Sequence, residues 1–246
     1  MRGKTAHVEV MLRNRILTIV SELLLTAGVL VLLFLGWKLW WQDSVAANQQ
    51  TAAASSQSKE WIDDYDHRKP AVPPDRYNPP VGVAPAAGTG FAVLYVPRFG
   101  DDYRRNIAEG FGDQVLNSFD LGIGHYPGTQ MPGELGNFAV AGHRSAYGGA
   151  MHWIDKLQPG DPIIVQTADG WYTYRFRSSE LVEPTEVEVV LPVPRQPDAE
   201  PTKRTITLIT CHPLYSSDER WVAYGEFESF ASLDKPPAEV APLLNQ

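Results

Sequence analysis

One uncharged apolar stretch near the N-terminus constrains this chain more than any other feature. Residues 23–37 contain no charged side chain and are dense in Leu and Val. Read generously, residues 16–37 form roughly 33 Å of helix, which matches a bilayer core of about 30 Å. We predict a transmembrane helix over residues 16–41, with Glu22 at its cytoplasmic boundary and Lys38 extending toward the far interface.

The residues on either side of this stretch predict its orientation. Basic side chains precede it and tryptophans end it, a pattern typical of a cytoplasmic N-terminus and an aromatic belt at the outer interface. We expect residues 1–15 in the cytoplasm and the chain after residue 41 outside the cell. A signal peptide cleaved near residues 44–46 is the alternative. The flanking residues are Arg2, Lys4, Arg13, Arg15, Trp37, Trp40 and Trp41.

Residues 42–88 have a different composition, rich in Ala, Ser and Gln and then in Pro. Such a segment buries too little apolar surface to fold alone. We predict a flexible linker that is partly extended where the prolines cluster. Residues 61–65, with Trp61 and Tyr65, are the exception, since they could form a helical turn or dock on the following domain.

From residue 91 onward the pattern is that of short β-strands. Asp169 and Gly170 separate two of them, which indicates a hairpin because Gly supplies the positive φ of a tight turn. Helical patterns are few, namely residues 106–117 in part and 150–157. Many short strands with little helix favour a closed or nearly closed β-barrel. The expected strands are residues 91–96, 137–141, 162–167, 171–176, 187–191, 204–210 and 221–227.

Charge and composition exclude several function classes. The formal net charge is −8, and the sequence has no basic stripe and no RNA- or DNA-binding motif, so we expect no nucleic-acid partner. The acidic residues lack the compact spacing of a calcium loop, so we predict no metal and no cofactor. The chain has one cysteine, Cys211, so no intrachain disulfide can form.

Cys211 is the candidate nucleophile. It ends an expected strand, and His212 and Pro213 interrupt the strand directly after it. The thiol therefore lies at a strand–loop junction, where catalytic groups often stand. An unpaired thiol in an exported protein risks oxidation, so its retention suggests a use. The alternative is a buried structural thiol.

A cysteine nucleophile needs a proton partner, and four histidines of the domain are available. His212 is a poor candidate because neighbours on a strand point to opposite faces. His152 falls in an expected helix and reads as a surface residue. His143 stands just past the end of an expected strand, and we favour it, with His125 left open as the alternative.

The reaction also needs a group that stabilises the oxyanion. Arg220 begins the strand that follows the Cys211 loop. If that strand pairs antiparallel with residues 204–210, Arg220 comes level with Cys211. A guanidinium is permanently charged and presents forked donors, which suits an oxyanion or a substrate carbonyl. From composition alone, three other arginines are equally available: Arg144, Arg175 and Arg204.

Two short motifs around these residues resemble those of sortases, a family of cysteine transpeptidases. Residues 207–211, Thr-Leu-Ile-Thr-Cys, are similar to the family's TLxTC signature, and Arg220 with a strand follows. Residues 141–144, Ala-Gly-His-Arg, match the family's catalytic histidine motif. The resemblance covers about residues 92–227, nearly the whole expected barrel.

The most similar class is class E, the housekeeping type of high-GC Gram-positive bacteria. Residues 94–98, Leu-Tyr-Val-Pro-Arg, and residues 124–128, Gly-His-Tyr-Pro-Gly, resemble that class. Tyr126 matches the tyrosine that is held there to favour Ala over Pro in the sorting signal. The resemblance thus implies an LAxTG-like substrate, with Tyr126 in substrate recognition. Thr210, which precedes Cys211 in the motif, would help to position the substrate.

The resemblance further implies an all-β, sortase-like closed barrel of about eight strands with a few short helices. Its catalytic domain would span residues 89–233, followed by a tail at 234–246. Cys211 would attack the Thr–Gly carbonyl, His143 would protonate the leaving amine, and Arg220 would bind the oxyanion.

The implied partners are sorting-signal peptides of secreted proteins and the amine of a lipid-linked peptidoglycan precursor, and we expect a monomer. One alternative is a class C, pilin-polymerising sortase. Those enzymes usually carry a second membrane helix after the barrel and an Asp-Pro-aromatic lid before it, and neither is present. A non-catalytic extracellular binding barrel with a structural cysteine is the other alternative. The sequence lacks the Ser-His-Gly-Cys motif of an L,D-transpeptidase.

Overall fold

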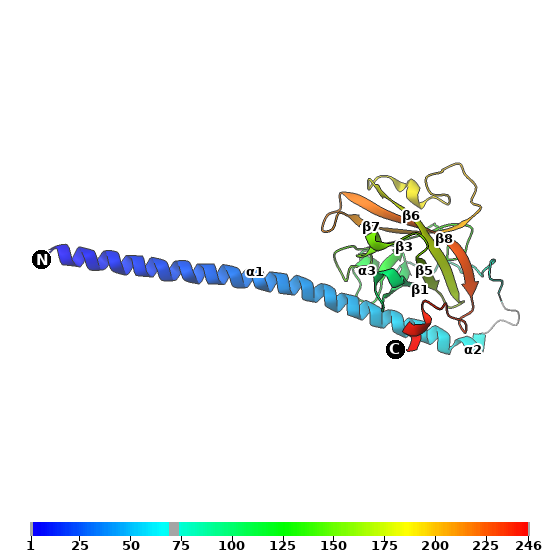
Figure 1. The fold of residues 1–246 in the computed structure, drawn as a ribbon, viewed down its shortest axis with the longest axis horizontal. Coiled ribbons are helices and arrows are strands. Elements are labelled where there is room, and N and C mark those ends of the chain that lie inside the picture. The colour runs from blue at the N-terminus through cyan, green and yellow to red at the C-terminus, as the bar shows by residue number, and fades with distance from the viewer. Residues whose placement is uncertain (1, 69–73, 246) are drawn as a thin grey trace. The chain divides into compact units, whose positions relative to one another are not determined.

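The computed structural model describes residues 2–68 and 74–245. By their internal contacts these residues divide into two compact units, Met1–Gln42 and Asp43–Gln246. The first unit consists of the N-terminal part of helix α1 (Arg2–Asp63). The second contains the rest of α1 and a β-barrel (Figure 1).

Residues 23–37 of α1, within the first unit, are uncharged and exposed. Leu24 and Leu25 have 68% and 72% of their surface accessible. An 18-residue window of this helix has a mean hydropathy of 2.4 and buries none of its residues. Within the described ranges it is the one helix that is long and apolar enough to cross a membrane. The rings of Trp37 and Trp41 stack at 5.8 Å, while the side chain of Trp40 lies outside the described residues.

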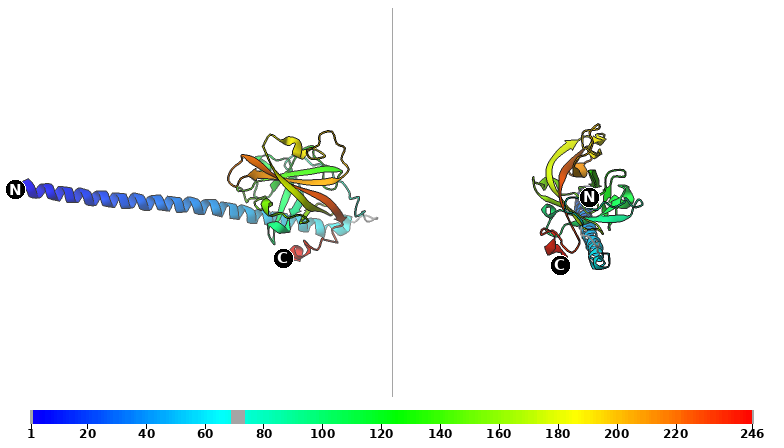
Figure 2. Two further views of the ribbon diagram at one scale, coloured as in Figure 1. Left: turned by 45° about the horizontal axis from the view of Figure 1, so that its top comes forward. Right: turned by 90° about the vertical axis from the view of Figure 1, so that its right-hand side faces the viewer.

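Eight strands in the described part of the chain form a closed barrel, which confirms the predicted fold (Figure 2). Their order around the barrel is β1-β2-β3-β4-β7-β8-β6-β5, with β5 pairing back to β1. The pairs β2–β3 and β4–β7 are parallel, and the others are antiparallel. The strands are β1 (Gly90–Tyr95), β2 (Arg104–Glu109), β3 (Gly122–His125), β4 (Gly136–Gly142), β5 (Pro162–Gln166), β6 (Trp171–Val182), β7 (Arg204–His212) and β8 (Glu219–Ala231).

The main hydrophobic core fills the barrel. Apolar side chains alternate along the strands, so that one face of each strand points inward. Burial of each large apolar side chain stabilises the fold by about 1.5–3 kcal/mol. Representative core residues are Leu94, Ile107, Val140, Ile163, Tyr172, Ile206 and Leu208, all at most 1% exposed.

Two predicted helices are shorter than expected. Residues 106–117 contain the end of β2, then Gly110 at a φ of 86°, and only one helical turn, α3 (Asp113–Leu116). Residues 150–157 contain a turn and the short 3-10 helix η2 (Ile154–Lys156). Another 3-10 helix, η1 (Pro97–Phe99), follows β1. The sequence predicted only that the strand ends before Pro97. Strand pairing has thus overridden the weak helical pattern before Gly110.

The predicted strand at residues 187–191 is wrong, because the segment forms the 3-10 helix η3 (Val187–Val190). Its β-branched residues favour a strand, but the segment pairs with no neighbouring strand. Instead, Asn137 Nδ2 donates hydrogen bonds to the carbonyl oxygens of Val189 and Leu191, both at 3.1 Å. Val189 is buried, whereas Val187 is 68% exposed.

The first part of the predicted flexible linker, residues 42–88, is helical and packed. Helix α1 continues to Asp63, and the short α2 (Tyr65–Arg68) follows. Four side chains at a spacing of four form one buried stripe on the helix, because i and i+4 share a helix face. Small side chains let this stripe lie close to the barrel despite their low hydrophobicity. The stripe consists of Ala46, Gln50, Ala54 and Ser58.

The rest of this segment fits the prediction more closely. Residues 74–89 form no helix and no strand, and residues 69–73 of the predicted linker, with Pro70 and Pro73, lie outside the described residues. Tyr65 is buried, as the exception at residues 61–65 allowed. The tail after residue 233 also packs, with Val240 and Leu243 buried beside a last 3-10 helix, η4 (Ala241–Asn245). The domain boundaries themselves stay a prediction.

Candidate active site

The β7–β8 ladder brings Cys211 and Arg220 together. The two strands are antiparallel, and Cys211 lies directly opposite Arg220. Side chains of directly opposed residues project from the same face, with Cβ atoms about 4.5–5.5 Å apart. Arg220 Nη1 donates hydrogen bonds to the carbonyl oxygens of Ser217 and Glu219, at 2.9 and 3.0 Å. These bonds hold the guanidinium against the backbone just before and at the start of β8.

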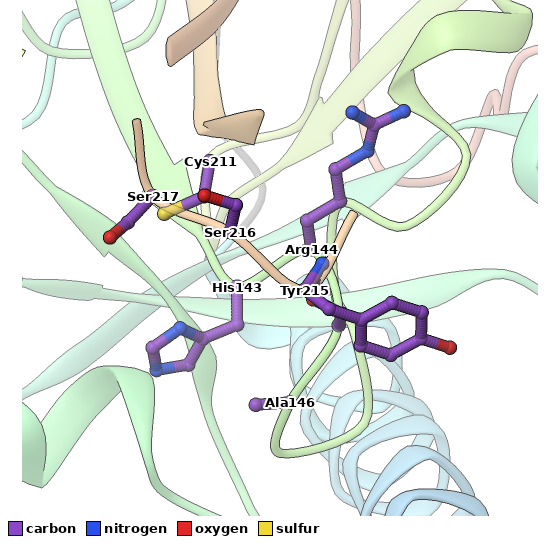
Figure 3. A pocket seen from close by; sticks show the side chains of 8 residues that line it. His143, Arg144, Ala146, Cys211, Tyr215, Ser216 and Ser217 are labelled. Atoms are coloured by element: carbon purple, nitrogen blue, oxygen red, sulfur yellow. Dashed lines mark hydrogen bonds between the residues drawn. The ribbon is translucent and has the colours of Figure 1, made fainter. Parts of the chain in front are cut away.

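His143 reaches the same region from the parallel neighbour of β7. In the β4–β7 pair, Ala141 lies opposite Ile209, so the residue just past the end of β4 comes level with Cys211. The Thr210 hydroxyl donates to the carbonyl oxygen of Gly142 at 2.7 Å and ties the two strand ends together. Figure 3 shows the Cys211 and His143 side chains projecting to the same side of one pocket.

This pocket has a volume of about 540 Å³ and lies at the ends of β4 and β7. Cys211 is only partly buried, so its sulfur is accessible from the pocket. Arg220 is not one of the lining residues. The lining residues are His143, Arg144, Ser145, Ala146, Cys211, Tyr215, Ser216 and Ser217 (Figure 3).

Two residues that the sequence did not single out hold the His143 ring. His143 Nε2 is 2.8 Å from Asn117 Oδ1, and the ring of Tyr147 lies 5.4 Å from the imidazole at an angle of 31°. An amide oxygen only accepts, so Nε2 carries a hydrogen and Nδ1 of the neutral ring keeps its lone pair. Burial lowers the pKa of His143, and the nearby Asp113 opposes that shift.

His125, the alternative to His143, lies outside the pocket. Its side chain is fully buried, and Nδ1 is 2.6 Å from Glu109 Oε2. Its Nε2 is 2.9 Å from Thr129 Oγ1. A ring with both nitrogens bonded in the barrel wall cannot serve Cys211. The geometry therefore favours His143 over His125.

His212 also fails as a partner, in keeping with its position next to Cys211. Its Nδ1 accepts a hydrogen bond from Arg144 Nη1 at 2.7 Å, and its ring lies 5.4 Å from that of Trp221. Arg144 is buried and lies 3.4 Å from Asp155 as well. Its guanidinium in Figure 3 points away from the sulfur.

Arg175 and Arg204, two alternatives to Arg220 as the oxyanion-binding group, form other contacts. Arg175 forms ion pairs with Glu228 and Glu239, at 2.8 and 3.1 Å. Arg204 Nε donates to the carbonyl oxygen of Gly133 at 2.6 Å. Arg220 is thus the arginine that the barrel places next to the thiol.

Tyr126 lies just past the end of β3 and close to the same groups. Burial raises its pKa, the positive charge of Arg220 lowers it, and a thiolate at Cys211 raises it. Both groups therefore lie near the phenol. Its ring packs on Phe111, with centroids 4.5 Å apart. The contact of Tyr126 with substrate stays a prediction.

Thr210 takes a different position from the other four predicted residues. It is buried, and its hydroxyl is bonded to the Gly142 carbonyl rather than directed at the pocket. Its predicted contact with substrate stays a prediction, while its observed contact joins β7 to β4. As for metals, no group of three or more His, Cys, Asp or Glu side chains that could hold an ion occurs in residues 2–68 and 74–245.

Comparison with known proteins gives a consistent family. Residues 94–228, more than half of the chain, match the sequence model of the family described as Sortase domain. The chain is 36% identical over 231 residues to Sortase SrtE1 of Streptomyces coelicolor. The match covers 90% of this chain and 60% of that protein, so the chain spans less than two thirds of the relative's length.

Solved structures of sortases have the same fold as this chain. The SrtA sortase from Actinomyces oris superimposes with a TM-score of 0.62 at 42% identity, covering 66% of this chain and 93% of that one. Sortase E1 from Streptomyces coelicolor, solved with a tripeptide in its active site, gives a TM-score of 0.57 at 36% identity. That match covers 65% of this chain and 99% of the other. Sequence and fold thus agree with the resemblance carried by the two motifs.

Proposed function

The chain belongs to the sortase family of cysteine transpeptidases, and we propose that it cleaves LAxTG-like sorting signals of secreted proteins and joins them to a cell-wall precursor. The observation that carries this proposal is the alignment of Cys211 opposite Arg220 across β7 and β8, with His143 beside the same pocket. A nucleophile, an acid and a permanent cation are the groups that acyl transfer through a thioester requires.

In the first half of the reaction, the Cys211 thiolate attacks the carbonyl carbon of the Thr–Gly bond. Negative charge develops on the carbonyl oxygen, where the Arg220 guanidinium would donate hydrogen bonds. The C–N bond breaks, and the His143 imidazolium gives its proton to the departing Gly amine. The products are a thioacyl enzyme and the released C-terminal peptide.

In the second half, an amine of a lipid-linked peptidoglycan precursor attacks the thioester carbonyl. The C–S bond breaks and returns the Cys211 thiolate, while neutral His143 takes a proton from the amine. The new amide bond attaches the secreted protein to the precursor. Because His143 acts first as an acid and then as a base, one ring serves both halves.

Two observations support the substrate class. The tripeptide in the active site of the related Sortase E1 supports a peptide substrate for this chain. The second is the position of Tyr126, close enough to Arg220 and Cys211 for both to influence its pKa. A side chain at that place could contact the residue that distinguishes LAxTG from LPxTG.

The N-terminal helix supports a membrane location for the enzyme. We infer a single-pass anchor with the N-terminus in the cytoplasm and the barrel outside, acting as a monomer. The apolar exposed surface of α1 supports a membrane environment, because such a surface is unfavourable in water. The basic residues before the helix support this orientation.

The proposal is tested by incubating the full-length chain, in detergent micelles, with paired LAxTG and LPxTG peptides and an amine acceptor. We expect cleavage at Thr–Gly, capture of the acyl group by the amine and faster turnover of the LAxTG peptide. A Cys211→Ala variant that still cleaves would reject the mechanism. Equal rates on both peptides would reject the role of Tyr126 but leave the mechanism intact.

A further inference from the structure

We propose that Gln50, on the part of α1 that packs against the barrel, is a positioning residue for His143. Because this role rests on the proposed function of His143, its test must distinguish the two. Gln50 lies in the segment that the sequence predicts to be a flexible linker, far along the chain from the predicted active-site residues. The structure places it directly behind the His143 side of the pocket.

Gln50 is fully buried and connects two loops. Its Nε2 donates one hydrogen bond to the carbonyl oxygen of Ser118 at 2.8 Å and another to that of Tyr147 at 3.0 Å. These acceptors lie 68 and 97 residues away in the sequence. The helix thus fixes the two loops relative to each other through a single side chain.

Two glycines make room for this amide. A Cβ atom added at Gly122 would lie 2.7 Å from Gln50 Nε2, and one added at Gly148 would lie 2.9 Å from Gln50 Oε1. Both glycines have positive φ, 101° and 83°. Either substitution would therefore force the amide out of its place as well as strain the backbone. The glycines thus leave space for the amide, whose Nε2 is bonded twice, while Oε1 is buried with no hydrogen-bond partner among the described residues.

Each of the two loops contacts one side of the His143 ring. Asn117, which accepts the hydrogen bond from His143 Nε2, directly precedes Ser118. Tyr147 carries the aromatic ring that lies 5.4 Å from the imidazole. The imidazole is therefore held by two loops, and Gln50 is the group that joins them from behind. Displacing either loop would move the ring relative to Cys211.

The contact needs two donors at one atom, and a primary amide supplies them without a charge. Two carbonyl oxygens need two donors, and the amide NH₂ supplies both from one atom. A carboxylate would repel both carbonyls, and a thioether would leave two buried acceptors without donors. Neighbouring contacts hold the helix in register, since Arg105 Nη1 donates to Thr51 Oγ1 at 2.7 Å.

The test compares Gln50→Met with Gln49→Met in the full-length chain in detergent micelles. Methionine keeps the length of the side chain but has no donor, and Gln49 is the exposed neighbour on the same helix. With an LAxTG peptide and an amine, we expect Gln50→Met to lower kcat on the order of tenfold, because small misplacement of a catalytic group is costly. KM should stay within about twofold, and Gln49→Met should match the wild type.

A double variant separates positioning from a general loss of stability. If Gln50 acts through the loop of Asn117, then Asn117→Ala combined with Gln50→Met should be little worse than Asn117→Ala alone. Multiplied losses would indicate that the two residues act independently and would overturn the proposal. Thermal unfolding of each variant checks that the assay temperature lies below its transition.

If Gln50→Met does not fold, Gln50→Ala replaces it, since it removes both donors without placing a charge or a longer side chain against the two carbonyls. A folded variant at Gln50 with the kcat of the wild type overturns the positioning role. In that case the wild type would still cleave and Cys211→Ala would not, so the proposed function would stand. A wild type that cleaves no sorting peptide would instead overturn the proposed function.

Discussion

The two sides of the active site are built in different ways. Cys211 and Arg220 lie opposite each other in a regular antiparallel ladder. His143 stands beyond the end of β4 and is held by side chains from loops, Asn117 and Tyr147. A ladder fixes its side chains through backbone hydrogen bonds, because a slip of one residue would turn every side chain to the other face. A loop position depends on a few individual contacts.

This difference indicates on which side of the active site a substitution far from the reacting groups can alter catalysis. On the ladder side, backbone hydrogen bonds keep the register when a neighbouring side chain is substituted, so we expect the largest losses of activity from the reacting groups themselves. On the loop side, a single hydrogen bond contributes about 1 kcal/mol, and its loss can move the ring. Residues without contact to substrate, such as Gln50, can therefore affect catalysis on that side.

The largest effect is expected on the ladder side, from Arg220→Ala. Removing the guanidinium removes the donors for the oxyanion, and we expect kcat to fall on the order of 100- to 1000-fold. The ladder should keep the fold, so the thermal unfolding transition should hardly move. Arg177→Ala, on an exposed arginine, is the matched control. A loss of less than about threefold at Arg220 would contradict its role.

A smaller effect is expected on the loop side, from Asn117→Ala. The change removes the acceptor for His143 Nε2, and the ring becomes free to rotate. We expect kcat to fall on the order of tenfold, with KM for the peptide little changed. Asn48→Ala, at an exposed position of α1, controls for the loss of an amide. If KM rises instead and kcat holds, Asn117 contributes to binding rather than to the orientation of His143.

Thr210→Val tests the connection between the two sides. The valine keeps the shape but leaves the buried Gly142 carbonyl without its donor, so we expect a loss of about 1–3 kcal/mol of stability. Activity should change less than in Asn117→Ala. Thr210→Ser retains the hydroxyl and should be closer to the wild type in unfolding experiments. Equal stability of the valine variant and the wild type would mean that the backbone pairing alone joins the strand ends.

The smallest expected effect is the contribution of His143 to the pH dependence of folding stability. Burial lowers the pKa of His143 below its ordinary 6.5, so between the two values the unfolded chain binds more protons than the folded one. Stability therefore rises with pH across this window, and acidification weakens the fold.

We expect His143→Gln to lose less thermal stability than the wild type when the pH falls from about 7.5 to about 5.5. His67→Gln, at an exposed position near the end of the helical segment, is the comparison. Identical losses in the wild type and His143→Gln would show that His143 does not contribute to this pH dependence.

Much of the barrel could be predicted from the sequence, because strands leave a local signal. Residues 91–95 are a continuous apolar run and residues 171–176 are rich in aromatic side chains, and both segments lie in strands, β1 and β6. The segment 187–191 has the same β-branched composition but pairs with no strand, and it forms a 3-10 helix. Propensity alone cannot distinguish these cases, since strand stability depends on a neighbouring strand.

The helical segment after residue 42 could not be predicted for a related reason. Its buried stripe is made of Ala46, Gln50, Ala54 and Ser58, which carry almost no hydrophobic signal. Small side chains are buried there because the barrel offers a surface that they fit, and that surface is assembled from distant strands. Asn117 and Gln50 were missed as functional candidates for the same reason, since neither lies in a recognisable motif.

By itself, the sequence determined the anchor-like apolar helix and the barrel, and it predicted which side chains react. Those features depend on local composition, on periodicity and on short motifs, which any stretch of chain carries within itself. Only the tertiary structure placed His125 outside the pocket that His143 lines, revealed the contacts of Asn117 and Gln50, and turned a presumed linker into part of the folded domain. These outcomes depend on contacts between residues tens of positions apart, and such contacts exist only when the barrel has closed.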